Sequence, residues 1–156
     1  MTEQFDMSSV SYPYGVLHDQ KLNKVVLDGN KMIFTFDIVI YPNNYYDETF
    51  RKYEDFKHCD MIVEMQDEPY NDIEFVTTVN SKGKFSGLSV NESEFIDIIN
   101  NASSAEYIGC SATCCGEFRI QLAIGFYNAK GKYKKYNKYD MCYITLDATA
   151  VKWNWY

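Results

Sequence analysis

The stretch KLNKVVLDGNKMIFTFDIVI, residues Lys21 to Ile40, decides the fold class. Two apolar runs flank Asp28-Gly29-Asn30, and an Asp-Gly pair between apolar runs is a strong signal for a β-hairpin. In the second run apolar and other residues alternate, which is the period of a strand with one buried face. The residues predicted to face the core are Met32, Phe34, Phe36, Ile38 and Ile40. We therefore predict an antiparallel hairpin packed on a core, with Thr35 and Asp37 pointing away from it.

Length and composition favour one globular domain over residues 1–156. A chain of this size can bury a core without disulfides or metals. Apolar residues make up 46% and aromatic residues 17%, mostly Tyr and Phe, which favour pleated, half-buried surfaces. Charged residues are 24%, which is typical of a folded rather than a disordered chain.

The chain is acidic, with 15 Lys and Arg against 22 Asp and Glu and a net charge of −7. This sign argues against nucleic acid as a partner and favours basic partners. The first ten residues carry Glu3 and Asp6 and lack the basic and apolar regions of a signal peptide. No apolar run is long enough to cross a membrane. We therefore predict a cytoplasmic protein with no membrane partner.

The segment SVNESEFIDIINNAS predicts one amphipathic helix near residues 91–103. Asn91 can cap it, with Glu94 three residues later in a capping-box-like arrangement. The apolar stripe, at spacing i, i+3, i+4 and i+7, consists of Phe95, Ile98, Ile99 and Ala102.

The remaining chain is strand-rich. HCDMIVEMQD and NDIEFVTTV predict a second hairpin around Pro69, and further strands are expected near 106–110, 117–127, 140–146 and 150–156. Residues 47–55 fit a long loop or a short helix. The last strand, VKWNWY, should pack through Trp153 and Trp155, although a Trp-lined partner site is an alternative. The fold class predicted is α+β, mainly antiparallel β in one sheet or two packed sheets, with one helix.

An acidic group accompanies the predicted second hairpin. If that hairpin is centred on Pro69, Glu64 faces Glu74 across it. We predict a partner-binding set made of Glu64, Asp67, Glu68, Asp72 and Glu74. Three interpretations compete: a solvated edge that prevents aggregation, an acidic surface for a basic partner, and a general acid/base pair.

The one basic stretch is KGKYKKYNKY, residues 130–139, where five lysines alternate with three tyrosines. Lysines beside stacking aromatics are typical of single-strand binding. A long hairpin loop explains the stretch equally simply, and we favour it because no wider basic face accompanies it. As an alternative site for a bound ligand it contributes Lys132, Tyr133, Lys135 and Tyr136.

The doublet His18-Asp19 is a candidate for metal or proton chemistry. The chain has only one other histidine, His58, so a metal shell here would need carboxylates or thiolates. No nucleophile-elbow motif is present. We favour a turn at a strand entrance, with Asp19 bonding nearby backbone amides, and we predict no catalytic residue.

The cysteines do not form a strong metal motif. They are Cys59, Cys110, Cys114, Cys115 and Cys142, an odd number that argues against a disulfide framework. A zinc site from His58, Cys59, Cys110 and Cys114 can be written, but the paired C-x2-C spacing is missing. Buried cysteines acting as small apolar side chains are the favoured interpretation, so we predict no metal and no cofactor.

The string LHDQKLNKVVLDGNKMIFTFD, residues 17–37, resembles the opening of small bacterial HD-containing immunity-type domains of polymorphic toxin systems, and of related Firmicute-type β-rich domains. The shared pattern is a His-Asp, a short strand, a turn and an apolar strand, here His18, Asp19, Leu22, Val25, Leu27, Met32, Phe34 and Phe36. CDMIVEM and VKWNWY are similar in style, whereas CSATCC is not part of the pattern. The resemblance implies a mainly β, non-enzymatic protein that blocks a toxin by binding it.

Two function classes follow. The first is a non-enzymatic interaction protein, an immunity-like inhibitor whose acidic face meets a basic toxin or another protein. The alternative is a small-molecule or nucleotide-binding accessory protein of a phage or bacterial defence system. A flat acidic patch would favour the first class, and a pocket lined by Tyr133, Tyr136 and lysines would favour the second. An enzyme ranks third.

Overall fold

The computed structural model describes residues 1–6, 17–39, 48–67, 71–77, 86–114 and 118–156. The described strands are β1 (Thr2–Asp6), β2 (Lys21–Asp28), β3 (Lys31–Asp37), β4 (His58–Met65), β5 (Asn71–Thr77), β6 (Ser86–Ser89), β7 (Ala102–Cys114), β8 (Phe118–Ala129) and β9 (Met141–Trp155). The described helices are α1 (Glu92–Asn100) and two 3-10 helices, η1 (Glu48–Tyr53) and η2 (Gly131–Tyr136).

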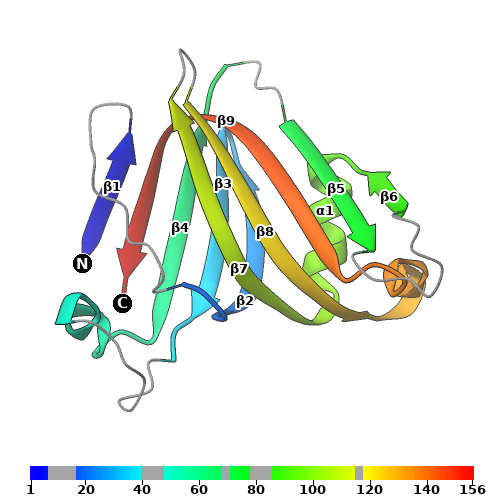
Figure 1. The fold of residues 1–156 in the computed structure, drawn as a ribbon, viewed down its shortest axis with the longest axis horizontal. Helices are drawn as coiled ribbons and strands as arrows, with labels where there is room; N and C mark the ends of the chain where they lie inside the picture. Colours follow the sequence, from blue (N-terminus) through cyan, green and yellow to red (C-terminus); the bar gives the residue numbers. More distant parts are fainter. Residues whose placement is uncertain (7–16, 40–47, 68–70, 78–85, 115–117) are drawn as a thin grey trace.

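The nine strands form one antiparallel sheet that closes on itself (Figure 1). The order is β4-β3-β2-β7-β8-β9, and a pairing between β9 and β4 completes a six-stranded barrel. β5 and β6 extend the sheet beyond the first half of β9, and β1 pairs with its second half. The prediction of mainly antiparallel β with one α-helix is confirmed, and the sheet closes rather than splitting into two.

The hairpin of β2 and β3 has the predicted turn. Asp28 pairs with Lys31, so Gly29 and Asn30 form the connection. Gly29 takes φ +58, in the left-handed region where a glycine carries no steric cost. The predicted inward set on β3 is buried: Met32, Phe34 and Phe36 at 0% exposure and Ile38 at 5%. Ile40 lies outside the described residues.

The prediction of two separate strands at 140–146 and 150–156 is wrong, because β9 is continuous over 15 residues. Asp147, Ala148 and Thr149 contain neither Gly nor Pro, so nothing in the backbone forces an interruption. Instead a register shift opposite Glu64 and Met65 leaves Thr149 unpaired with β4. Such a bulge bends a strand, and Figure 1 shows β9 arching over the top of the molecule.

The predicted hairpin around Pro69 is also wrong. β4 pairs with residues 148–155 of β9, and β5 pairs with residues 141–146. Both are antiparallel to β9, so β4 and β5 follow its bend instead of pairing with each other. Glu64 therefore lies opposite Lys31 and Ala150, and Glu74 lies opposite Tyr143 and Ser89. Local sequence favours a hairpin here, but the long β9 offers each strand a partner of its own.

Helix α1 covers the place in the barrel where two neighbouring strands, β2 and β7, share the fewest residue pairs. These strands share one residue pair, Lys21 with Glu106. Beyond it, the Asn100 side chain accepts from the Val25 N–H at 2.8 Å and donates to the Val25 carbonyl at 2.9 Å. The side-chain amide of Asn100 thus satisfies backbone groups of β2 that a neighbouring strand would otherwise pair.

The helix also buries three of the four residues of its predicted apolar stripe, whereas the fourth, Ala102, lies in β7. Phe95, Ile98 and Ile99 are buried against the core, and the Asn91 Oδ1 accepts from the Glu94 N–H at 2.9 Å. The helix ends at Asn100, short of the predicted 103, because β7 begins at Ala102. No helix among the described residues is long and apolar enough to span a membrane.

Candidate functional site

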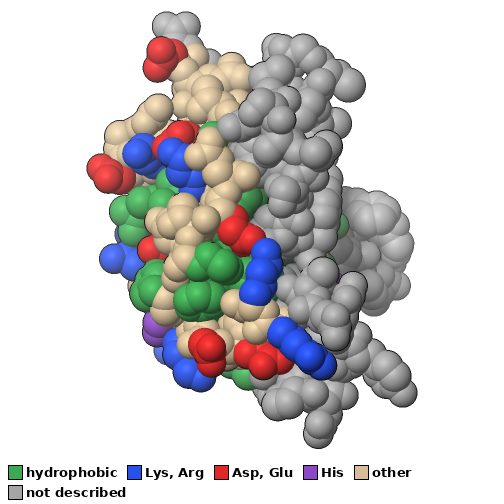
Figure 2. Space-filling model, turned by 90° about the vertical axis from the view of Figure 1, so that its left-hand side faces the viewer, with side chains coloured by type: hydrophobic (Ala, Val, Ile, Leu, Met, Phe, Trp, Pro, Cys, Tyr) green, Lys and Arg blue, Asp and Glu red, His purple; other side chains and the backbone are tan. Residues whose placement is uncertain are grey.

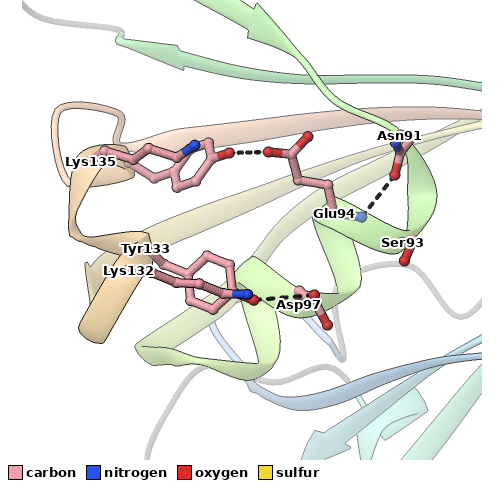
Figure 3. A pocket seen from close by; sticks show the side chains of 8 residues that line it. Asn91, Ser93, Glu94, Asp97, Lys132, Tyr133 and Lys135 are labelled. Atoms are coloured by element: carbon pink, nitrogen blue, oxygen red, sulfur yellow. Dashed lines mark hydrogen bonds between the residues drawn. The ribbon is translucent and has the colours of Figure 1, made fainter.

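A pocket opens between the N-terminal turns of α1 and the 3-10 helix η2, and we call it the α1–η2 pocket (Figure 3). Its volume is about 420 Å³, within the usual range for a small-ligand site. From η2 it is lined by Lys132, Tyr133, Lys135 and Tyr136. From α1 it is lined by Asn91, Ser93, Glu94 and Asp97. All four residues of the predicted alternative ligand site are therefore brought together in it.

The sequence explains why η2 presents these side chains together. Lys-Tyr pairs recur every three residues, at 132–133, 135–136 and 138–139. A 3-10 helix has three residues per turn, so side chains three apart lie above one another. Because β8 and β9 pair with each other, their connection is a hairpin loop, as predicted, and it contains the 3-10 helix η2.

Two tyrosine–carboxylate hydrogen bonds join η2 to α1. The Tyr136 hydroxyl donates to the Glu94 Oε1, and the Tyr133 hydroxyl donates to the Asp97 Oδ2 at 3.1 Å. The two tyrosines are three residues apart on η2, and the two carboxylates are three residues apart on α1. The two hydrogen bonds therefore run side by side between the helices (Figure 3). These two hydrogen bonds hold η2 against α1 and so position the two walls of the pocket.

Tyr136 stays a protonated donor at neutral pH. Burial raises the pKa of Tyr136 to about 12, and its hydrogen bond to Glu94 adds to the rise. Each of these hydrogen bonds occupies one oxygen of its carboxylate, and an ionised carboxylate has two oxygens with about four acceptor positions. Glu94 and Asp97 can therefore each accept further hydrogen bonds from a molecule in the pocket.

Two lysine ammonium groups complete the pocket. The Lys132 and Lys135 Nζ atoms each lie 4.9 Å from the ring centroid of the following tyrosine, which is cation–π distance. Hydrogen bonding to Tyr133 raises the pKa of Lys132, with a further contribution from Asp97. The lining thus combines two cations, two carboxylates and two aromatic rings, and it suits a small ligand with groups of both polarities.

Two residues of the predicted acidic set, Glu64 and Glu74, have close neighbours within the sheet. Glu64 is paired with Lys152 at 2.8 Å and with Lys31 at 3.6 Å, and the hydrogen bond from Lys152 lowers the pKa of Glu64. The Glu74 carboxylate lies over Gly87 of β6, where a Cβ would overlap it. The Glu64 carboxylate is therefore paired within the sheet, and the Glu74 carboxylate packs over a neighbouring strand.

Two of the other three acidic residues lie in the described part of the chain. Asp72 is exposed on β5, and Asp67 lines a separate pocket of about 320 Å³ that also contains Asn71 and Glu92. Glu68 lies outside the described residues. On the side that carries β1, Figure 2 shows acidic and basic side chains interspersed with hydrophobic ones, without an area of one sign among the described residues. The acidic-face hypothesis stays a prediction.

The His18-Asp19 doublet forms the predicted turn. The Gln20 N–H donates to the Leu17 carbonyl at 3.0 Å, and Asp19 takes φ +62. The Asp19 Oδ2 lies 3.0 Å from the His18 Nδ1, and both side chains are more than half exposed. The carboxylate thus pairs with its histidine neighbour, where we had expected a bond to backbone amides.

The proposed zinc ligands do not form a cluster in the described part of the chain. Cys59 and Cys142 are free thiols buried in the core, and burial raises the pKa of both. The His58 Nδ1 lies 3.1 Å from the Asp37 Oδ1 instead. Cys115 and the side chains of Cys110 and Cys114 lie outside what the structure describes.

Sequence reasoning missed the α1 wall of the pocket. Glu94 was assigned only to the helix cap, and Asp97 was not assigned to any site. One signal was present: carboxylates three apart on a helix match tyrosines three apart on a 3-10 segment. Nothing local indicates that the two segments meet, since 36 and 42 residues separate the bonded pairs.

Comparison with protein-family models, with curated proteins and with solved structures found no match. The resemblance to immunity-type domains therefore stays a prediction, and the candidate site is argued from its geometry alone.

Proposed function

We propose that this protein is a small-molecule binding protein, with the α1–η2 pocket as its site. The observation that carries the proposal is the convergence of Lys132, Tyr133, Lys135 and Tyr136 with Glu94 and Asp97 around one pocket. The sequence alone had favoured a protein partner. The pocket now supports the alternative better, because Glu64, the first residue of the predicted acidic set, is engaged by two lysines.

The lining defines the chemistry of the ligand. Ammonium groups on η2 attract an anionic group, and the remaining carboxylate oxygens on α1 accept from N–H or O–H donors. Tyrosine rings offer an apolar surface for a flat or aliphatic portion. Nucleotides and zwitterionic metabolites combine these features. A folded polymer or a protein loop is less suited to a volume of about 420 Å³.

Saturation-transfer NMR with a probe panel tests the proposal. The panel contains AMP, adenosine, glutamate and inorganic phosphate. We expect at least one organic probe to receive saturation, and the Lys132→Ala/Lys135→Ala double variant to lose most of that signal.

The matched control is Lys134→Ala, which lies on the same 3-10 helix and outside the pocket lining. It should retain the signal of the unaltered protein. Equal signals in the double variant and the unaltered protein, or no signal from any probe, would contradict the proposal.

A further inference from the structure

Lys132 and Lys135 are placed as a pair. They are three residues apart in η2, where side chains at i and i+3 eclipse and each residue rises about 2.0 Å, so their backbone positions are roughly 6 Å apart along the axis. Both ammonium groups have the same relation to a neighbouring ring, at 4.9 Å from its centroid. Both lysines therefore lie on the η2 wall of the pocket.

A phosphate monoester matches this pair in both charge and geometry. It carries about −1.5 to −2 charges near pH 7, which two lysines neutralise. Its three terminal oxygens can accept from both ammonium groups at about 2.7–2.9 Å. A carboxylate carries one charge and would leave one lysine unbalanced.

The opposite wall gives the ligand an orientation. Glu94 and Asp97 are held in place by hydrogen bonds from Tyr136 and Tyr133. Because both carboxylates are negatively charged, they repel a phosphate from the α1 wall. The same carboxylates accept hydrogen bonds from amino or hydroxyl groups. A bound molecule should therefore direct its phosphate toward η2 and its donors toward α1.

We infer that the ligand of the α1–η2 pocket is a phosphorylated small molecule, whose phosphate bridges Lys132 and Lys135 and whose donor groups meet Glu94 and Asp97. This inference rests on the proposed function and names its ligand class. AMP has both features, since its phosphate is accompanied by an exocyclic amine and ribose hydroxyls.

Isothermal titration calorimetry with AMP and with adenosine tests the inference. AMP should bind at least about tenfold more tightly than adenosine, because charge-assisted hydrogen bonds contribute most of the gain. Lys132→Gln and Lys135→Gln should each weaken AMP binding by about 10-fold or more and reduce the advantage of AMP over adenosine. Lys134→Gln should change AMP binding by less than about twofold.

The outcomes separate the two proposals. If adenosine binds as tightly as AMP and the binding depends on the pocket residues, the phosphate inference is wrong and the small-molecule function stands. If neither probe binds the folded protein, nor inorganic phosphate, the phosphate inference is wrong, and the small-molecule function is wrong as well if glutamate also fails to bind. Circular dichroism of each glutamine variant confirms that it is folded, which is expected because both lysines are exposed.

Discussion

The two 3-10 helices both place a Lys-Tyr pair near a glutamate, but the surroundings of the two glutamates differ. In η1, Lys52 and Tyr53 both meet the Glu3 carboxylate, at 2.6 and 2.8 Å, and the Lys52 ammonium lies 4.8 Å from the Tyr53 ring. In η2, the Lys135 ammonium lies 4.9 Å from the Tyr136 ring, and the Tyr136 hydroxyl donates to Glu94. We call these the η1 cluster (Lys52, Tyr53, Glu3 and Trp155) and the η2 cluster (Lys135, Tyr136 and Glu94).

The clusters differ in what covers them. Trp155 donates to Glu3 at 3.1 Å, and its ring lies 4.4 Å from that of Tyr53, which is only 2% exposed. Both Glu3 oxygens are therefore engaged by this cluster. In the η2 cluster, Glu94 accepts from Tyr136 at the wall of a pocket. Glu3, with both carboxylate oxygens engaged, joins β1 to η1 and β9. Glu94 joins α1 to η2 but also lies beside a pocket, where it can accept hydrogen bonds from a ligand.

The largest expected effect is the removal of the aromatic cover. Trp155→Ala should lower the free energy of unfolding by about 3–5 kcal/mol, because a large side chain that is 2% exposed leaves a cavity. Denaturant unfolding followed by circular dichroism measures it. The control Tyr156→Ala removes a neighbouring aromatic that is 56% exposed and should cost far less. Similar losses in both variants would mean that Trp155 is not the cover of the η1 cluster.

A smaller effect separates the two carboxylates. Glu3→Ala should destabilise the protein by about 1–3 kcal/mol, because it leaves the buried Tyr53 hydroxyl without its acceptor. Glu94→Ala should cost less than about 1 kcal/mol, because water in the pocket can replace the lost partner of Tyr136. Denaturant unfolding of both variants, with the exposed Glu54→Ala as a control, makes the comparison. Equal losses for Glu3 and Glu94 would remove the distinction between the clusters.

A further effect concerns the two phenols. Burial raises the pKa of both Tyr53 and Tyr136 to about 12. A folded pKa above the unfolded value of 10.0 gives stability that is present below about pH 10 and is lost as the pH rises toward about 12.

Replacing either tyrosine therefore has two consequences. Tyr53→Phe and Tyr136→Phe should each cost about 1 kcal/mol at neutral pH. Each should also show a smaller loss of unfolding free energy between about pH 8 and about pH 11 than the unaltered protein. The exposed Tyr127→Phe is the control and should follow the unaltered protein. An unchanged alkaline loss in both variants would show that these phenols do not carry it.

Much of the local structure could be predicted from sequence. Alternation identified the buried face of β3, and Asp28-Gly29 identified its turn. The Asn91 cap and the stripe of Phe95 and Ile98 identified α1. These signals succeed because they depend on contacts within a few residues of one another.

The failures share one cause. The hairpin at Pro69 and the break in β9 were reasonable from local pattern, yet β4 and β5 each pair with a strand more than 60 residues further along the chain. Strand pairing is decided by which edges are available once the sheet is assembled. That information is not contained in the pairing segments themselves.

The sequence by itself determined that the chain forms antiparallel strands, one capped helix and a hairpin loop whose Lys-Tyr pairs repeat every three residues. Only the tertiary structure decided that the sheet closes into a barrel, that Glu64 meets lysines instead of Glu74, and that η2 lies against α1. Periodicity and capping act over a single turn or hairpin. Barrel closure and the α1–η2 pocket require segments tens of residues apart to meet, and only packing of the whole core brings them together.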